Sequence, residues 1–326
     1  AVQQVSEYNI GGYILFGRDF DGKTKDEVVD DIHSYQNEAD IPLLIGVDEE
    51  GGTVVRVSSN PNLRETPFLS PKDTYADGGW DAVKRDAEEK ADLLLSLGIN
   101  VNLAPVCDMT SDEYGFMYDR SFSSDVDMEN RYVRTVVETS KSKKLGTVLK
   151  HFPGYGNNSD THTGIAYDDR DYSEFENTDF KPFYQGIESG ADCILVSHNI
   201  VNCMDSEYPA SLSQKVHDIL RNEFKFDGVI MTDDLIMDAI TDFTGDEAAA
   251  VTAAKCGNDL LCCSSVDTQY PAVLEAVQNG EISEAQVDAS VKRILKWKQN
   301  LGIFNIDTYQ KKVKSTEPTD TVGSEE

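Results

Sequence analysis

Short apolar runs recur along this chain of 326 residues, separated by longer polar stretches. Within each run the residues are apolar throughout, with no alternation between apolar and polar positions. Parallel strands covered on both faces have this pattern, because neither face meets water. The pattern predicts seven strands, at residues 11–17, 42–48, 99–105, 146–152, 193–198, 228–233 and 259–264.

Segments with helical periodicity separate the apolar runs. Residues 25–36 place Val28, Val29 and Ile32 on one side of a helix. Helices are also predicted at residues 80–98, 211–224 and 284–302, and Gly98 closes the first of these. Repeated strand–helix units indicate an α/β fold, which is either a (β/α)8 TIM-type barrel or a doubly wound open sheet.

Two observations favour the barrel over the open sheet. No Gly-x-Gly-x-x-Gly motif opens a helix after a strand, so the dinucleotide-binding fingerprint is missing. Polar residues also follow several of the apolar runs, and in a barrel the carboxyl ends of the strands converge on one mouth. These residues are Asp48, Lys150, His151, His198 and Asp233.

The domain organisation is expected to be simple. No linker rich in Pro, Gly or Ser divides the chain, so residues 1–305 are predicted to form one barrel domain. The polar tail at residues 306–326 is expected to be disordered.

Composition limits the partners. Asp and Glu number 59 against 29 Lys and Arg, a net charge of −30, which repels nucleic acid and anionic membranes. No run of 18 apolar residues exists, so no membrane span is expected. None of the six cysteines forms a Cys-x-x-Cys pair, so no structural zinc is expected. A monomer without metal or cofactor is the expectation.

The cellular location stays open. The chain starts at Ala1 without a visible signal peptide, and we expect it to be a processed, trimmed or fragmentary product. The cysteines lean towards a reducing interior. The absence of an initial Met and the polar, acidic tail favour an exported protein whose signal has been removed. We favour export.

Two pairs of residues, one of two acids and one of an acid and a histidine, are candidates for chemistry. Asp233 ends a strand, where a carboxylate can attack carbon or stabilise a cation; Asp234 is expected to cap a helix that starts at Leu235. Asp160 and His162 lie two positions apart in a long loop at residues 153–173. A carboxylate that fixes the tautomer of a histidine makes a proton donor near neutral pH, although an isolated Asp-x-His is a weak signal.

Four further residues are candidates for holding a ligand. Lys150 and His151 end a strand, and one side chain is expected to face the barrel and the other the helices. Asp48 precedes two glycines that let the backbone approach a ligand, and Arg120 offers a fork of donors from a loop, where a surface ion pair is the alternative. The remaining histidines, His33 and His217, are expected to be solvated on helices.

Seven segments together resemble glycoside hydrolase family 3, in its β-N-acetylglucosaminidase branch. They lie in family order between residues 11 and 237, and the resemblance extends to about residue 303. The Pro-Gly after Lys-His, followed by Asp-x-His, distinguishes this branch from the β-glucosidase branch. The segments are GGYILFGRDF, VDEEGGTVVR, NLAPVCDM, DRSFSSD, KHFPGYGNNSDTH, YPASLS and GVIMTDDLIM.

The resemblance implies a retaining exo-β-N-acetylglucosaminidase that removes terminal GlcNAc from peptidoglycan fragments or chitin oligomers. It implies Asp233 as the nucleophile and His162 as the general acid/base, with Asp160 as its partner. Residues that hold the sugar would be Asp48, Arg120, Lys150, His151 and, lining the site, His198.

The chain departs from the family pattern at Tyr155, where His is usual, and at Thr53, where Arg is usual. The family also has a strand before residue 11, so the first barrel strand is expected to be missing; the chain is either a fragment or open at that seam. The alternatives to the main hypothesis are a family 3 β-glucosidase or glycoside phosphorylase, a metal-dependent barrel hydrolase, and an inactive sugar-binding barrel.

Overall fold

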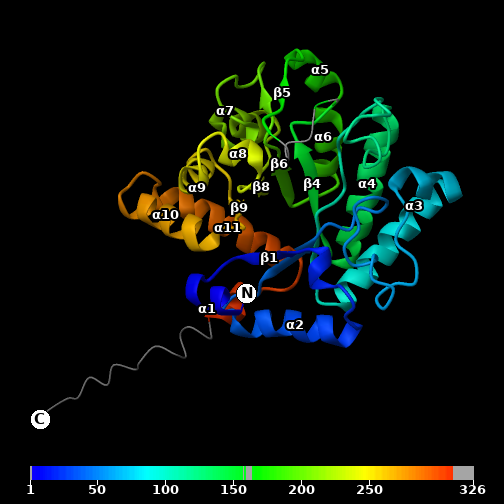
Figure 1. Cartoon of the computed structure of the whole chain (residues 1–326), viewed down its shortest axis with the longest axis horizontal. Coiled ribbons are helices and arrows are strands. Elements are labelled where there is room, and N and C mark those ends of the chain that lie inside the picture. The colour runs from blue at the N-terminus through cyan, green and yellow to red at the C-terminus, as the bar shows by residue number, and fades with distance from the viewer. Residues whose placement is uncertain (1, 157, 159–163, 311–326) are drawn as a thin grey trace, which may run out of the picture.

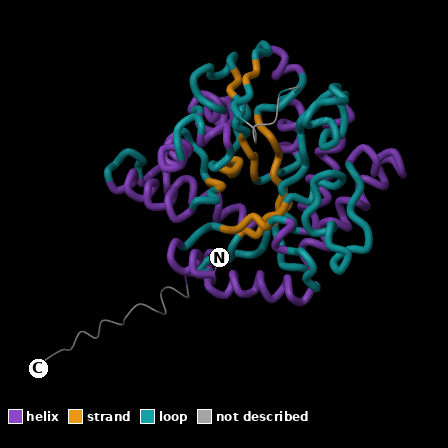
Figure 2. The backbone as a smooth tube through the Cα atoms, viewed as in Figure 1, coloured by secondary structure: helices purple, strands orange, loops and turns teal. Residues whose placement is uncertain are grey.

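A computed structural model defines the fold and describes residues 2–156, 158 and 164–310. Its centre is a β-sheet that curls around the middle of the molecule, with helices on the outside (Figures 1 and 2). The prediction of an α/β fold is therefore confirmed.

All seven predicted strands lie in one parallel sheet, in the order β1-β2-β3-β4-β6-β8-β9. Two shorter strands, β5 and β7, pair separately. The strands are β1 (Gly12–Leu15), β2 (Leu44–Val47), β3 (Val101–Asn102), β4 (Gly146–Phe152), β5 (Tyr167–Asp168), β6 (Cys193–Val196), β7 (Ile200–Val201), β8 (Val229–Asp234) and β9 (Leu260–Cys262).

Helices connect successive strands of the sheet, and short 3-10 turns lie at Gly17–Asp19 and Ala210–Leu212, with a π turn at Ile219–Glu223. The α-helices are α1 (Val2–Tyr8), α2 (Lys25–Glu38), α3 (Pro71–Ser96), α4 (Val126–Lys143), α5 (Tyr172–Asn177), α6 (Phe180–Glu188), α7 (Gln214–Asp218), α8 (Asp238–Thr241), α9 (Asp246–Lys255), α10 (Val266–Gln278) and α11 (Glu284–Asn300).

Helix starts follow local capping chemistry. The Thr24 backbone amide donates to the Glu27 carboxylate at 2.8 Å, and the Glu27 amide donates back to Thr24 Oγ1 at 3.4 Å, so α2 begins with a capping box. Ser70 caps α3, with Pro71 at the first helical position. These caps satisfy backbone amides that would otherwise have no partner in the first turn.

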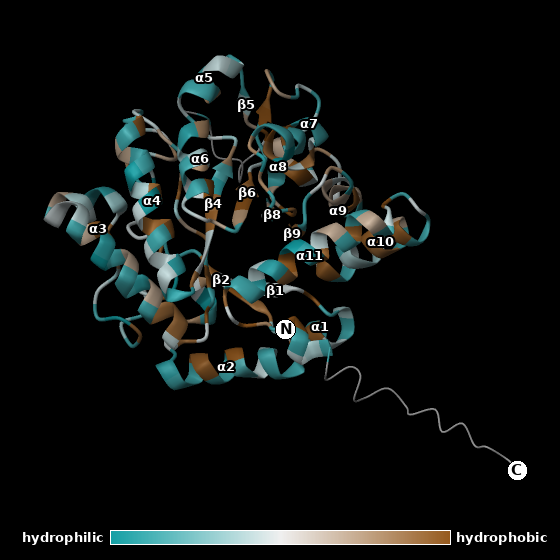
Figure 3. Ribbon diagram, turned by 180° about the vertical axis from the view of Figure 1, so that it is seen from behind, coloured by the Kyte–Doolittle hydropathy of each residue, from teal (hydrophilic) through white to brown (hydrophobic). Residues whose placement is uncertain are grey.

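Apolar side chains cover both faces of the sheet, as parallel strands require. In Figure 3 the strands β2 and β6 are strongly hydrophobic, whereas α2 alternates hydrophilic and hydrophobic bands. One core cluster lines the inside of the curl, and two others pack the sheet against the helices. The inner cluster includes Leu44, Val101, Leu103, Val148, Leu195, Met231 and Trp297; the outer clusters include Ile32, Ile45, Leu94, Leu149, Phe183 and Ile194.

The strand order follows the sequence order without a reversal. A doubly wound sheet has a point at which this order reverses, so the described strands do not form one. The order ends at β1 and β9, and a cavity of about 530 Å³ lies along both strands. Gln269 and Trp297 line it, and neither the Gln269 amide nor the Trp297 Nε1 has a hydrogen-bond partner among the described residues.

The described residues at the two ends of the chain are helical and contribute no strand to the sheet. Residues 306–310 have helical backbone, and residues 311–326 lie outside the described part of the chain, so the tail at 306–326 stays a prediction. No helix in the described part is long and apolar enough to cross a membrane.

A buried acid on α4 has a consequence for stability. Glu129 is completely buried, and its Oε2 accepts a hydrogen bond from the Ser123 amide at 2.9 Å. Burial raises the pKa of the Glu129 carboxyl well above its usual value, and the charge of Asp108 adds to the effect. The folded protein therefore keeps a proton on Glu129 that the unfolded chain releases above about pH 4.3.

We expect Glu129→Gln to change how stability depends on pH. As pH rises above the pKa of the unfolded chain, the wild type loses free energy of unfolding through this group, up to about 1.4 kcal/mol per pH unit. The variant has no proton to lose, so its stability relative to wild type should increase as pH rises above about 4.3, the pKa of this group in the unfolded chain. Urea unfolding at several pH values measures this. Glu138→Gln, at an exposed position of the same helix, is the control, and parallel curves for Glu129→Gln and wild type would contradict the expectation.

Candidate active site

Polar side chains lie where the strands of the sheet end. Asp48 follows β2, Lys150 and His151 lie near the end of β4, and Asp233 lies near the end of β8. Parallel strands bring these ends to one edge of the sheet. The Cys262 thiol shows this closeness. Burial raises its pKa, and the charges of Asp234, Asp233 and Asp48 raise it further. Asp48 after β2 and Asp233 in β8 are far apart in the strand order, yet both are near enough to this thiol to affect its pKa.

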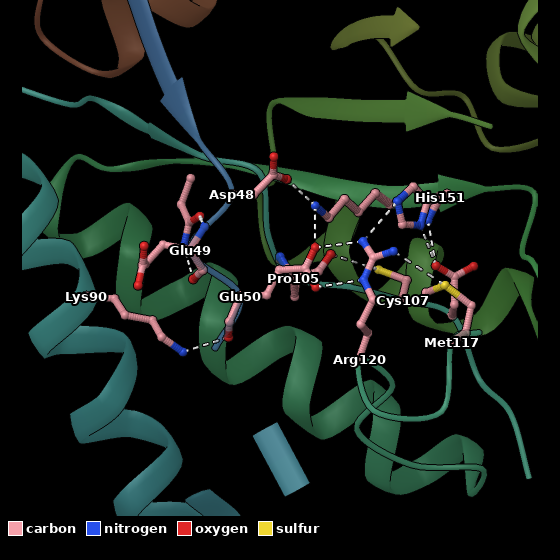
Figure 4. Close-up of polar contacts among 12 residues, drawn as sticks. Asp48, Glu49, Glu50, Lys90, Pro105, Cys107, Met117, Arg120 and His151 are labelled. Carbon is pink, nitrogen blue, oxygen red and sulfur yellow. Dashed lines mark hydrogen bonds and ion pairs between the residues drawn. The ribbon is translucent and has the colours of Figure 1, made fainter. Parts of the chain in front are cut away.

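A buried carboxylate at this edge, Glu50, is a residue that sequence reasoning missed. Lys150 Nζ lies 2.6 Å from both Asp48 Oδ1 and Glu50 Oε1. Arg120 holds Glu50 with two hydrogen bonds, from Nε to Oε2 at 2.9 Å and from Nη2 to Oε1 at 2.8 Å. We call Asp48, Glu50, Arg120 and Lys150 the Glu50 cluster (Figure 4).

The pKa values of Glu50, Lys150 and Arg120 are shifted, and each shift favours the charged form of the side chain. Burial alone would raise the pKa of the Glu50 carboxyl, but Lys150 and Arg120 outweigh it and hold the pKa well below its usual range. Burial would lower the pKa of Lys150, but Asp48 and Glu50 raise it. Burial would also lower the pKa of Arg120, but the charge of Glu50 outweighs it, and the pKa of Arg120 is raised. Arg120 is therefore a buried partner and not a surface ion pair.

The turn after β2 carries Glu50 into the cluster. The neighbouring Glu49 is buried, and its carboxylate accepts hydrogen bonds from the backbone amides of Arg56 and Val57 at 2.9 and 2.7 Å. Gly51 has a φ of 104°, and a Cβ there would lie 2.1 Å from the Leu69 carbonyl oxygen. A side chain at position 51 would therefore break this turn.

His151 is fixed between an acid and a cation. Asp108, a second residue that sequence reasoning missed, accepts hydrogen bonds from His151 Nδ1 at 2.7 Å and from the amides of His151 and Tyr155 at 3.0 and 2.7 Å. Arg120 Nη2 lies 3.3 Å from His151 Nε2. Because a guanidinium can only donate, Nε2 is the acceptor and Nδ1 carries the proton.

The side chains of Lys150 and His151 point towards the same group of residues: Lys150 contacts Glu50, and His151 contacts Arg120. The expectation that one of the two faces the helices is therefore wrong. The pairing of β4 with β6 shifts register between Leu149 and Phe152. Such an irregularity re-aims side chains that simple alternation would send to opposite faces. The Cys107 amide donates to the Lys150 carbonyl at 2.6 Å and anchors this part of the strand.

Asp233 and Asp234 have different surroundings. The Asp234 amide donates to Asp233 Oδ1 at 2.9 Å. Asp234 itself accepts hydrogen bonds from the amides of Ile236 and Ser264 at 3.3 Å and from the Ser264 hydroxyl. The expected helix start at Leu235 is wrong: the chain first turns, and α8 begins at Asp238. Asp234 therefore caps a turn and ties it to the segment after β9.

The other histidines divide between interior and surface. His198 follows β6 and is completely buried, with Nδ1 at 2.7 Å from Ser211 Oγ and Nε2 at 3.0 Å from the Asp234 carbonyl oxygen. His33 is exposed, as expected. His217 is buried, so the expectation that it is solvated is wrong; its Nδ1 donates to the Ser213 carbonyl at 2.8 Å, and burial lowers its pKa.

The two residues expected to move protons, Asp160 and His162, lie outside the described residues. The described residues on either side are held firmly. Asn158 donates to Asp168 Oδ2 at 2.6 Å. Arg170 binds Asp168 and Asp179, and it also donates to the Gly154 carbonyl at 3.2 Å.

No group of three or more His, Cys, Asp or Glu side chains in the described ranges is arranged to hold a metal ion. The cations contact carboxylates, His151 contacts Asp108 and Arg120, and Asp233 contacts the adjacent amide.

Residues 1–297 match the model of the glycosyl hydrolase family 3 N-terminal domain. The chain is 31% identical over 286 residues to the β-hexosaminidase of Hydrogenovibrio crunogenus, covering 85% of this chain and 79% of that protein. It is 32% identical over 273 residues to the β-hexosaminidase of Nitrosomonas eutropha, covering 81% and 77%. A solved glycoside hydrolase family 3 β-N-acetylglucosaminidase from Paenibacillus sp. str. FPU-7 matches with a TM-score of 0.86 at 28% identity, over 99% of this chain and 60% of that one.

The fold and these matches define the class of the protein, a glycoside hydrolase. The chain belongs to glycosyl hydrolase family 3, and the resemblance inferred from its seven segments is confirmed. The chain spans 60%, less than two thirds, of the length of the Paenibacillus structure.

We expect Glu50→Gln to destabilise the protein strongly. Removing one partner of a buried ion pair leaves the others uncompensated, which costs about 3 kcal/mol or more. Urea unfolding at neutral pH measures the loss. Glu65→Gln, at an exposed position in the same segment, is the matched control and should lie within about 0.5 kcal/mol of wild type. Equal stability of the two variants would contradict a central role for the Glu50 carboxylate.

Proposed function

We propose that this chain removes terminal β-linked N-acetylglucosamine residues from glycosides, with retention of configuration. The observation that carries the proposal is the set of polar side chains at the strand ends, in a chain whose relatives are named β-hexosaminidases. The Paenibacillus match, named a β-N-acetylglucosaminidase, supports the same sugar.

The reaction is a double displacement. The Asp233 carboxylate attacks the anomeric carbon, while His162 gives its proton to the leaving glycosidic oxygen. His162 then takes a proton from water, which hydrolyses the glycosyl-enzyme. Asp160 is the partner of His162. Asn158 donates to Asp168, and Arg170 donates to the Gly154 carbonyl, so the described residues that flank this loop are anchored.

The Glu50 cluster and His151 would bind the terminal sugar. Lys150 and Arg120 offer N–H donors, and Asp48, which is only partly buried, offers acceptor oxygens to sugar hydroxyls. Because Glu50 and Asp108 already fix these side chains, little side-chain entropy remains to be lost when sugar binds. The family resemblance implies that His198 also lines the sugar-binding site.

Peptidoglycan fragments and chitin oligomers are the proposed substrates, since both carry terminal β-linked GlcNAc. The net charge of −30 gives no attraction to polyanions such as nucleic acid. We propose that the enzyme acts as a monomer.

For the architecture, we propose a (β/α)8-type barrel whose first strand is missing from the described part of the chain. The sequential order of the seven parallel strands supports it, as does the curl of the sheet in Figures 1 and 2. The order ends at β1 and β9, and residues of both strands line one cavity, which supports a gap between them; the same cavity reaches the inside of the curl at Leu103, Val148 and Met231.

Kinetics on 4-nitrophenyl β-GlcNAc, the matching β-glucoside and a GlcNAc disaccharide test the function. Wild type should cleave the GlcNAc substrates in preference to the glucoside. Asp233→Ala should reduce turnover to background, because no other group attacks the sugar. His162→Ala should lower kcat on the disaccharide by about 10²–10⁴-fold. The loss on the nitrophenyl glycoside should be smaller, because nitrophenolate leaves without protonation.

Asp238→Asn is the matched control, at an exposed acid shortly after Asp233, and should behave as wild type. Full activity of Asp233→Ala would disprove the proposed nucleophile. Sugar binding without turnover by wild type would favour the inactive barrel, and faster cleavage at high phosphate, with glycosyl phosphate as product, would favour the phosphorylase.

A further inference from the structure

A buried polar pair lies behind the proposed nucleophile. His198 and Ser211 are both completely buried. Ser211 Oγ lies 2.7 Å from His198 Nδ1, and the Asp234 carbonyl oxygen lies 3.0 Å from Nε2. The imidazole thus spans from the segment after β7 to the end of β8, where Asp233 is located.

The direction of these hydrogen bonds follows from the atoms involved. A carbonyl oxygen can only accept, so His198 Nε2 carries the proton and donates to Asp234. Nδ1 is then the acceptor, and the Ser211 hydroxyl donates to it. The Asp234 carbonyl therefore fixes the tautomer of His198, and the Ser211 hydroxyl satisfies the Nδ1 lone pair of that tautomer.

Ser211 is itself held at both ends of its backbone. Its amide donates to the Ser197 carbonyl at 2.9 Å. Its carbonyl accepts hydrogen bonds from Asn258 Nδ2 at 2.8 Å and from Cys256 Sγ at 3.3 Å. The hydroxyl that fixes His198 thus comes from a rigid part of the core.

The Asp234 backbone connects this pair to Asp233. The Asp234 amide donates to Asp233 Oδ1 at 2.9 Å, so the position of this amide helps to set where the Asp233 carboxylate points. On the other side, the Leu235 amide donates to the Cys262 carbonyl at 3.1 Å. The Asp234 carbonyl lies between these two hydrogen bonds, and His198 controls its orientation.

We propose that His198 is a positioning residue for the nucleophile and not a sugar-binding residue. With Ser211 it holds the Asp234 carbonyl, and through the Asp234 amide it keeps the Asp233 carboxylate aimed for attack. The proposal rests on the proposed function of Asp233. It predicts that His198 affects the rate of bond cleavage and leaves sugar binding nearly unchanged.

Two substitutions separate the roles of the ring nitrogens. In His198→Gln the amide nitrogen takes approximately the place of Nε2 and can still donate to Asp234. In His198→Asn the amide reaches only the place of Nδ1, so the bond to Asp234 is lost. We expect His198→Asn to lower kcat for GlcNAc glycosides by about 10–100-fold with KM within about threefold, since misplacement of a reacting group has effects of this size. His198→Gln should restore most of kcat.

A sugar-binding role predicts a different pattern, in which both substitutions raise KM and His198→Gln gives no rescue. That pattern overturns the proposal, as does a kcat of His198→Asn close to wild type. Ser211→Ala keeps the test open if His198→Asn does not fold. It should lower kcat by a smaller factor, and unchanged kinetics for this variant would also count against the proposal.

Amide hydrogen exchange gives a readout that does not need turnover. The Asp234 and Leu235 amides should exchange faster in His198→Asn than in wild type, and at nearly the wild-type rate in His198→Gln. If wild type cleaves no GlcNAc substrate but the exchange pattern holds, the proposed function fails, while the hold of His198 on the Asp234 carbonyl stands. If wild type is active and exchange is the same in all variants, the positioning role fails alone.

Discussion

The buried carboxylate of Glu50 is the constraint on which the rest of the site depends. A carboxylate in this position costs several kcal/mol unless cations compensate it. Arg120 and Lys150 supply that compensation from a loop after β3 and from β4, while Glu50 comes from the turn after β2. One charge therefore joins three segments far apart in the sequence. It also keeps the long, flexible side chains of Arg120 and Lys150 in place, and such preorganisation would favour the sugar binding that we propose for them.

The two buried histidines at the strand ends extend this order towards Asp233, the proposed nucleophile, and they have opposite tautomers. Asp108 and Arg120 leave the proton of His151 on Nδ1, while Ser211 and the Asp234 carbonyl place that of His198 on Nε2. In each case a rigid polar neighbour decides which nitrogen donates. The hydrogen bonds of His198 thus help to fix the end of β8, where Asp233, the proposed nucleophile, is located.

Much of this fold could be predicted from sequence, because unbroken apolar runs identify buried parallel strands, and all seven were found. Asp48, Lys150, His151 and Asp233 stood out because they follow such runs. Glu50 and Asp108 did not, since nothing local marks two acids among 59 as buried; their importance comes from partners 70 and 43 residues away. The prediction that the Lys150 and His151 side chains point to opposite faces was wrong because the pairing of β4 shifts register there. The periodicity of the helix around His217 does not show that the His217 ring is buried.

The central claim is that Asp233 attacks the sugar and forms a covalent intermediate in a site organised by Glu50. The most direct measurement is to trap that intermediate with a slow fluorinated GlcNAc glycoside, digest the protein and locate the added mass by peptide sequencing. The account predicts one sugar per chain, attached to Asp233, and release of the β-anomer on turnover. A sugar attached to another residue, or release of the α-anomer without any adduct, would contradict it.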